Sequence, residues 1–362
     1  MIEKESNQPL RKGWTTGTCA TAATAAAFHA LITGRFPDPV TVILPNGLKP
    51  SFPIHDKFLS DTCAKVGIIK DAGDDPDVTH GAIIYSTVKR LKSGQGIIFK
   101  AGEGIGTVTK PGLPLQVGEP AINPVPRQFM AAAAQNLAYL YKTHPDIEIT
   151  LSIPNGETLA KSTWNSKLGI IGGLSILGTT GVVIPYSCSA WIASIHRGID
   201  VCRANNITHA AACTGSVSEQ TIKKIYQMPD IALLDMGDFV GGTLKYLRKH
   251  PISRLTIGGG FGKISKLAAG HKDLHSKRSQ VDRHFLANIL EKLGAQPSFL
   301  KKILEANTAD QIIQESIQNQ LPLGDFIARQ AKRICLDLVD HQLNIEIIIV
   351  NRTGHIVGQA GF

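Results

Sequence analysis

The sequence predicts a protein of mixed α/β and α+β class with two domains: an α+β sheet domain in residues 1–164 and a parallel α/β domain in residues 165–362. The chain has 362 residues, and about 100–200 residues usually make one domain. The first part alternates paired apolar segments with two helical segments, whereas the second repeats a strand followed by a helix three times. We place the boundary near Trp164, before a glycine-rich stretch.

The first domain is expected to be an antiparallel sheet with helices on one face. An alanine-rich helix is predicted at residues 18–31, where Thr15 or Thr16 can cap its start and Gly34 can end it. A hairpin is predicted around the Asn46-Gly47 turn. The remaining elements are strands at residues 63–70 and 82–91, a second hairpin at 96–110, a helix at 123–142 and a strand at 147–156.

The second domain is expected to hold parallel strands, each followed by a helix. The strands are predicted at residues 181–187, 207–216, 231–238 and 254–260, with a closing strand pair within 344–361. The helices are predicted at residues 190–205, 219–226, 239–250, 262–270, 281–294, 309–318 and 324–339.

The charge balance limits the kinds of partner. Thirty-eight basic against twenty-nine acidic residues give +9, which favours nucleic acid, an anionic membrane or a polyanionic small molecule, unless the basic surface only serves solubility. The six cysteines are scattered without a CxxC pair, so neither a disulfide framework nor a zinc knuckle is expected. No apolar run reaches the roughly 18 residues of a membrane span. The first residues lack an apolar signal core, which predicts a cytoplasmic protein.

Two groups of glycines predict close approach of the backbone to a ligand. Residues 167–183, KLGIIGGLSILGTTGVV, are too rich in glycine for a helix and too apolar for a linker. The turns CTGS, DMGDFVGG and IGGGFGK follow three predicted strands, where parallel sheets bind ligands and helix N-termini bind anions. Turns chosen only for packing are the alternative. The candidate cofactor-binding residues are Gly172, Gly173, Gly178, Thr179, Thr180, Gly215, Asp235 and Gly237.

A basic segment follows the last of these turns. Lys263 and Lys266 would lie on one face of a helix, and His275 and Arg278 follow within a few residues. Two earlier glycine- and proline-rich loops add hydrogen-bond donors at Lys110 and Arg127. These six residues are candidate substrate-binding residues, the alternative for the segment being a solvated basic helix face.

An acidic loop, KDAGDDPDVTHG at residues 70–81, holds four aspartates and a histidine. Clustered carboxylates can form a metal site or a base with a raised pKa, although the spacing is not that of an EF-hand. The candidate catalytic residues are Asp74, Asp75, Asp77 and His80, and a solvated acidic turn is the alternative.

Five long motifs in one order resemble the cobalt-precorrin-5B (C1)-methyltransferase family, the CbiD family. They are RKGWTTGTCATAA, IIKDAGDDPDVTHG, GEGIGTVTKPGLPLQVGEPAINPVPR, LGIIGGLSILGTTGVV and GKISKLAAGHKDLHSKRSQVDR. The resemblance implies methyl transfer from S-adenosylmethionine to ring carbon C1 of cobalt-precorrin-5B, giving cobalt-precorrin-6A in cobalamin biosynthesis. It also implies two α/β domains, of which a Rossmann-like second domain binds the cofactor.

The implied substrate agrees with the charge of the chain. A corrinoid precursor is rimmed with acetate and propionate groups, which suits a basic crevice, and its cobalt arrives with it. His80 or His275 could approach that cobalt as an axial ligand. Two other classes stay open as alternatives, a nicotinamide-dependent oxidoreductase and a nucleic-acid-binding protein, but the sequence has neither a GxGxxG fingerprint nor a recognition helix. A homo-oligomer is possible.

Overall fold

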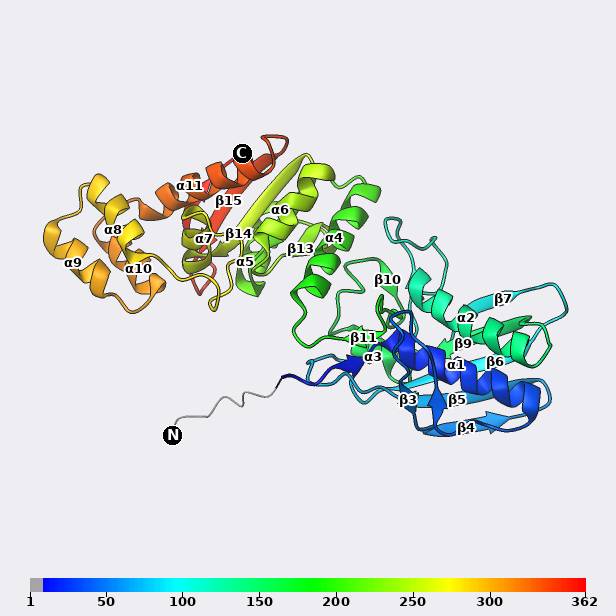
Figure 1. The fold of residues 1–362 in the computed structure, drawn as a ribbon. Coiled ribbons are helices and arrows are strands. Elements are labelled where there is room, and N and C mark those ends of the chain that lie inside the picture. Colours follow the sequence, from blue (N-terminus) through cyan, green and yellow to red (C-terminus); the bar gives the residue numbers. More distant parts are fainter. Residues whose placement is uncertain (1–8) are drawn as a thin grey trace. The chain divides into compact units, whose positions relative to one another are not determined.

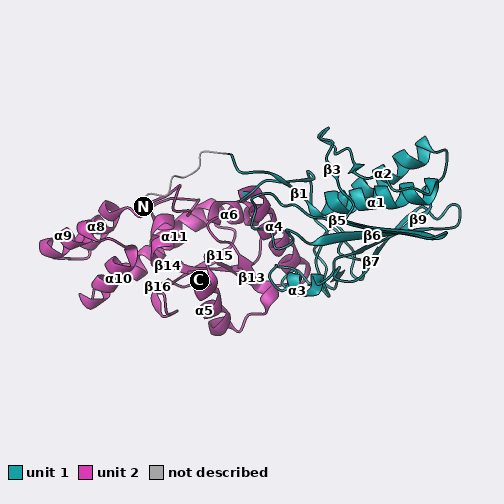
Figure 2. Ribbon diagram, turned by 90° about the horizontal axis from the view of Figure 1, so that it is seen from below, with its two compact units in different colours: residues 1–187 teal, residues 188–362 magenta. Residues whose placement is uncertain are grey.

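The computed structural model describes residues 9–362 and divides the chain into two compact units, the first ending at Ser187 and the second running from Cys188 to Phe362 (Figure 2). The division falls after Ser187 rather than near Trp164, which corrects the expected boundary. The reason is strand pairing by the glycine-rich stretch. Its strand β10 (Ile170–Ile171) pairs with β8 (Thr107–Val108), and its strand β11 (Val182–Val183) pairs with β1 (Gly13–Trp14).

The first unit is built on a five-stranded sheet of order β4-β5-β6-β9-β7, with two helices on one face (Figures 1 and 2). The strands of this sheet are β4 (Asp56–Leu59), β5 (Cys63–Ile69), β6 (Ile83–Arg90), β7 (Ile97–Ala101) and β9 (Ile147–Ser152). The helices are α1 (Thr16–Thr33), α2 (Pro124–Leu140) and the short α3 (Gly156–Ala160). A separate hairpin joins β2 (Val40–Thr41) to β3 (Ser51–Phe52), as predicted around Asn46-Gly47.

The hairpin predicted at residues 96–110 is wrong. Strand β7 pairs in parallel with β9, so the sheet is mixed rather than antiparallel, and β8 pairs elsewhere. The glycines between the two strands explain this. Gly104 has a φ of 72°, and its backbone packs against Gly156, which turns the chain away from β7 instead of back along it.

Helix α1 forms much of the core of the first unit. Thr15 caps its N-terminus by accepting a hydrogen bond from the Thr18 amide, and Gly34 ends it in the left-handed conformation with a φ of 75°. Most of the helix is buried, and its alanines let it pack closely on the sheet. The Thr24 hydroxyl lies 2.8 Å from the Ser86 hydroxyl on strand β6, so a buried polar group is satisfied across this contact.

The second unit is built on a sheet of order β13-β12-β14-β15-β16, in which only β16 runs antiparallel to its neighbour. Its strands are β12 (His209–Cys213), β13 (Leu233–Asp235), β14 (Arg254–Gly260), β15 (Asn344–Val350) and β16 (Ile356–Ala360). The predicted strand-helix repeats are thus confirmed. Strand β12 comes first in the chain but lies between β13 and β14, so the strand order reverses at the carboxyl ends of β12 and β14.

Helices cover both faces of this sheet. Alternate residues of the strands enter two separate buried clusters, one on the side of α5 and the other on the side of α4, α6, α7 and α11 (Figure 1). The helices are α4 (Cys188–Ala204), α5 (Ser216–Tyr226), α6 (Val240–Lys249), α7 (Phe261–Ala268), α8 (Arg283–Lys292), α9 (Pro297–Glu305), α10 (Ala309–Gln318) and α11 (Leu323–Leu338). A 3₁₀ turn, Asp230–Ala232, precedes β13. Helix α9 was not predicted from the sequence.

Candidate functional site

The three glycine turns predicted at strand ends lie side by side in the second unit. Cys213 at the end of β12 pairs in register with Asp235 of β13 and with Gly258 of β14. The amide of Thr214 donates to the Gly258 carbonyl at 2.9 Å, and the amide of Gly237 donates to the Cys213 carbonyl at 3.0 Å. Residues far apart in the sequence therefore meet at one edge of the sheet, where parallel sheets bind ligands.

These glycines do not all serve the same purpose. A Cβ at Gly259 would lie 2.7 Å from the Thr214 hydroxyl, and one at Gly258 would overlap the Ile222 side chain, so both glycines allow close packing. Gly215 is exposed, and a Cβ there would meet nothing within 4 Å. It immediately precedes α5, so open backbone lies at a helix N-terminus next to the point where the strand order reverses.

An aromatic residue that we did not predict, Trp191, lies beside these turns. Its indole Nε1 donates to the Asp235 carbonyl at 3.1 Å, and its ring lies 3.5 Å from the position of a Cβ on Gly237. The residue is 41% exposed, and its ring centroid is 6.2 Å from that of Phe239. The only sequence signal was a tryptophan near the start of a predicted helix, which does not indicate what the ring faces.

The ammonium groups of Lys263 and Lys266 bind other groups of the second unit instead of pointing freely into the predicted ligand crevice. Lys263 forms an ion pair with Asp238, and Lys266 Nζ donates to the Leu274 carbonyl at 3.0 Å. Lys266 is only 6% exposed, and burial, with the charge of Lys263 adding to it, lowers its pKa. The two lysines fasten the segment after α7 to the turn after β13, whereas we expected them to face the substrate.

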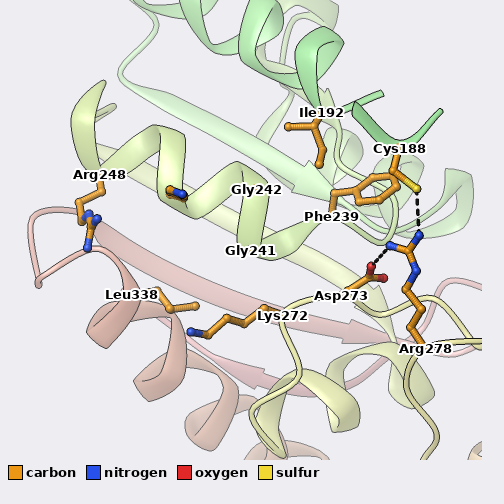
Figure 3. Close-up of a pocket in the computed structure, with 11 residues that line it drawn as sticks. Cys188, Ile192, Phe239, Gly241, Gly242, Arg248, Lys272, Asp273, Arg278 and Leu338 are labelled. Carbon is orange, nitrogen blue, oxygen red and sulfur yellow. Dashed lines mark hydrogen bonds and ion pairs between the residues drawn. The ribbon is translucent and has the colours of Figure 1, made fainter. Parts of the chain in front are cut away.

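The other two candidates of the basic segment are exposed. His275 Nδ1 accepts from the amide of Lys277 at 3.2 Å. Arg278 donates to Asp273 at 2.5 Å and to the Cys188 sulfur at 3.3 Å, so the guanidinium is held at one end of a groove (Figure 3). The carboxylate of Asp273 and the Cys188 sulfur raise the pKa of Arg278, which stays charged.

The acidic loop lies in the first unit, and its candidate catalytic side chains are engaged by neighbouring parts of the chain. Asp74 accepts from the Arg11 amide at 2.6 Å, Asp75 accepts from the Tyr186 amide at 2.8 Å, and His80 Nδ1 accepts from the Ala72 amide at 3.1 Å. Asp77 forms an ion pair with Lys70, which is 2% exposed and also donates to Thr79. The loop is therefore held by neighbouring segments, while Asp74 and His80 remain exposed to solvent.

The Asp77–Lys70 pair predicts acid sensitivity. Burial alone would raise the pKa of Asp77, but the charge and hydrogen bond of Lys70, with hydrogen bonds from Thr79, together lower it. A folded-state pKa below that of the unfolded chain means stability that is fully present above the ordinary carboxyl value of about 3.9 and lost as the pH falls through the lower folded value. At pH values below about 4, we expect the urea concentration at the midpoint of unfolding to decrease. An Asp77→Asn variant whose midpoint falls just as steeply would contradict this.

The glycine stretch of residues 167–183 packs against the first unit's own backbone. A Cβ at Gly173 would overlap the Gly104 carbonyl, and one at Gly178 would overlap the Thr15 side chain. The carbonyls of Leu177 and Gly181 accept from the amides of Gly17 and Thr15 at 3.0 and 3.1 Å, so the stretch satisfies the N-terminus of α1. Packing accounts for these glycines in place of the expected ligand contact.

Only part of this stretch is open to solvent. Gly172, with a φ of 86°, has nothing within 4 Å of a Cβ position, and Thr179 and Thr180 are exposed. Thr180 bonds to the backbone of Val182 in a local turn. These residues belong to the first unit, whereas Gly215, Asp235 and Gly237 belong to the second.

The two loop residues Lys110 and Arg127 are also held by the first unit. Arg127 donates to the carbonyls of Ile122 and Pro120 and to the Glu119 carboxylate, at 2.7, 3.1 and 3.0 Å. Lys110 packs over Gly169, where a Cβ would lie 2.6 Å from the lysine Cβ. Arg127 therefore orders its own loop. Within residues 9–362, no three His, Cys, Asp or Glu side chains are grouped to hold a metal ion, and no helix there is long and apolar enough to cross a membrane.

An open, mostly parallel sheet with bare backbone, a carboxylate and an aromatic ring at its carboxyl ends is the arrangement at which α/β proteins commonly bind small ligands. A family model described as CbiD matches residues 3–185, and a second, described as CbiD, C-terminal domain, matches residues 273–361. The chain belongs to the CbiD family.

Individual relatives agree with this membership. A protein of Brucella anthropi named cobalt-precorrin-5B C(1)-methyltransferase is 54% identical, covering 99% of this chain and 97% of the relative. A protein of the same name from Paramagnetospirillum magneticum is 52% identical, covering 98% and 99%. A crystal structure of a cobalamin biosynthesis protein (cbiD) from Archaeoglobus fulgidus is 28% identical, covers 74% of this chain and 83% of that one, and has a TM-score of 0.39.

Proposed function

We propose that the chain is a C-methyltransferase that transfers a methyl group from S-adenosylmethionine to ring carbon C1 of cobalt-precorrin-5B, giving cobalt-precorrin-6A in cobalamin biosynthesis. The observation that carries the proposal is the 54% identity, over 99% of the chain, to a relative with this named activity. The names of the relatives support neither an oxidoreductase nor a nucleic-acid-binding protein.

The Rossmann-like second unit supplies the methyl-donor site in this proposal. The exposed turn at Gly215 offers backbone N–H groups to the donor's carboxylate. Asp235 lies on the strand beside that turn, where its carboxylate can accept hydrogen bonds from ribose hydroxyls. Trp191, which packs over Gly237, offers a ring on which adenine can stack. S-adenosylmethionine supplies an electrophilic methyl group when bound.

The protein's part in the reaction is largely positioning. Methyl transfer needs the methyl group, its leaving sulfur and the ring carbon in line, and it needs water excluded. Within the acidic loop, His80 is the candidate base in this proposal, because its side chain is 53% exposed and its Nε2 has no partner among residues 9–362. The corrinoid brings its own cobalt as substrate.

The donor site is tested by calorimetry with S-adenosylhomocysteine and with NAD. We expect the wild-type chain to bind the first and not the second. Stacking of a base on an aromatic ring contributes about 1–3 kcal/mol, so Trp191→Ala should weaken S-adenosylhomocysteine binding about tenfold. Trp191→Phe, which keeps a flat ring, should retain most of the affinity.

The possible results distinguish a failure of the proposed donor site from a failure of the proposed reaction. Heat with NAD and none with S-adenosylhomocysteine, with the corrinoid present or absent, would overturn the methyltransferase proposal. If a folded Trp191→Ala variant binds S-adenosylhomocysteine as tightly as wild type, the proposed reaction stands, but the methyl donor binds elsewhere than at this edge of the sheet.

A further inference from the structure

A groove of about 480 Å³ runs along helix α6 of the second unit (Figure 3). Its walls come from four parts of the chain: the start of α4, the turn into α6 with α6 itself, the segment after α7, and the end of α11. Of the residues that line it, only Arg278 was proposed above as a substrate-binding residue.

The lining carries one carboxylate, Asp273, and four cations, so its formal charge is +3. The cations are Lys245, Arg248, Lys272 and Arg278. The carboxylate is bound by Arg278 at 2.5 Å. Arg248 lies 3.7 Å from Asp340. Within residues 9–362, no carboxylate lies within ion-pair distance of Lys245 or Lys272, so two exposed ammonium groups lack a counter-charge.

The local sequence explains why Lys272 lies in the groove. The Gly241 amide donates to the Lys272 carbonyl at 2.9 Å, and a Cβ at Gly241 would lie 2.8 Å from the Lys272 Cβ. Glycine at this position therefore lets the segment after α7 pack on the first turn of α6. That turn adds the partial positive charge of a helix N-terminus to the same end of the groove.

The rest of the lining is apolar. Ile192, Phe239 and Leu338 line the groove between the cations (Figure 3). Phe239 is also the ring that contacts Trp191, so the groove adjoins the residues proposed to hold the methyl donor. An apolar lining with a cationic rim suits a ligand with an apolar body and several carboxylates. It does not suit S-adenosylmethionine, whose sulfonium and ammonium groups are both cationic.

We propose that this groove binds the carboxylate-bearing edge of the corrinoid, with Lys245 and Lys272 contacting its acetate or propionate groups. The inference rests on the proposed function, since it places that function's substrate. It assigns substrate recognition to residues of α6 and the segment after α7, in place of the internally paired Lys263 and Lys266.

The test uses the full chain and two stable probes: cobyrinic acid, with free carboxylates, and its fully methyl-esterified form. Wild type should bind the acid more tightly than the ester, and more weakly as salt rises. Hydrogen bonds to charged groups in a partly desolvated site contribute more than exposed ion pairs, so a Lys245→Ala/Lys272→Ala double variant should bind the acid about ten- to thirtyfold more weakly. Its affinity for the ester and for S-adenosylhomocysteine should not change.

Matched controls are exposed lysines that do not line the groove: Lys249→Ala on α6 and Lys277→Ala in the segment after α7. Wild-type affinity for the acid in both controls supports the inference. An equal loss of affinity for the acid in the control variants, or no loss in the double variant, overturns the inference. If the wild type still transfers the methyl group, the proposed function stands. A wild-type chain that neither binds the acid nor methylates cobalt-precorrin-5B overturns both.

Discussion

Replacing Gly173 with valine is expected to unfold the first unit rather than to impair a ligand site. The added Cβ would overlap the Gly104 carbonyl and lie 2.8 Å from the Ile105 nitrogen, and neither backbone group can move without breaking the local pairing. Overpacking against a backbone belongs to the mechanisms that destabilise by more than about 4 kcal/mol. Urea unfolding followed by circular dichroism measures the loss.

Gly172→Ala is the matched control, because Gly172 is the adjacent residue but is exposed, with no atom within 4 Å of its Cβ position. Its φ of 86° should limit the cost to about 1–3 kcal/mol. Gly173→Ala should be worse than Gly172→Ala. If a folded Gly173→Val protein melts like wild type but has lost methyl transfer, the stretch contacts a ligand and the packing interpretation is wrong.

Replacing Asp77 with alanine is expected to cost about 3–5 kcal/mol of the free energy of unfolding, because it leaves the Lys70 ammonium buried without its carboxylate. The double variant Lys70→Met/Asp77→Ala should recover much of that loss, since the buried charge is removed together with its partner. Thermal and urea unfolding of both singles and the double form a double-mutant cycle.

A catalytic role for Asp77 makes the opposite prediction. Asp77→Ala would then keep wild-type stability while methyl transfer falls, and the double variant would not recover activity. Asp75→Ala is a useful comparison, because the Asp75 carboxylate accepts from the Tyr186 amide and, within residues 9–362, no lysine is buried against it. It should cost less stability than Asp77→Ala.

Local patterns predicted most of the secondary structure. The Thr15 cap and the Gly34 end of α1, the hairpin at Asn46-Gly47, and the helix at 309–318 were all confirmed. Each of these elements depends on helix capping, on turn chemistry or on the spacing of apolar residues, which act within a few residues. The predictions that failed concerned tertiary structure. Strand β7 pairs with β9 rather than β8, and the domain boundary follows strand pairing that no local pattern reports.

The candidate site was predicted in part for the same reason. The meeting of the turns at Cys213, Asp235 and Gly258 followed from parallel topology, because the carboxyl ends of parallel strands share one edge. Trp191 and Lys245 were missed, and Lys272 was not among the proposed binding residues, because their significance lies in what faces them after folding.

The sequence by itself determined the mixed α/β class, the strand ends that form an open edge, the basic charge and the family resemblance. Only the tertiary structure decided which of its glycines and charges are available to a ligand. A glycine permits close approach but does not specify whether backbone or ligand approaches: Gly173 meets Gly104, while Gly215 meets open space. A lysine carries the same charge wherever it lies. Lys266, however, is buried against a carbonyl, whereas Lys272 lines a groove and has no carboxylate partner among residues 9–362. That difference arises only when distant segments pack.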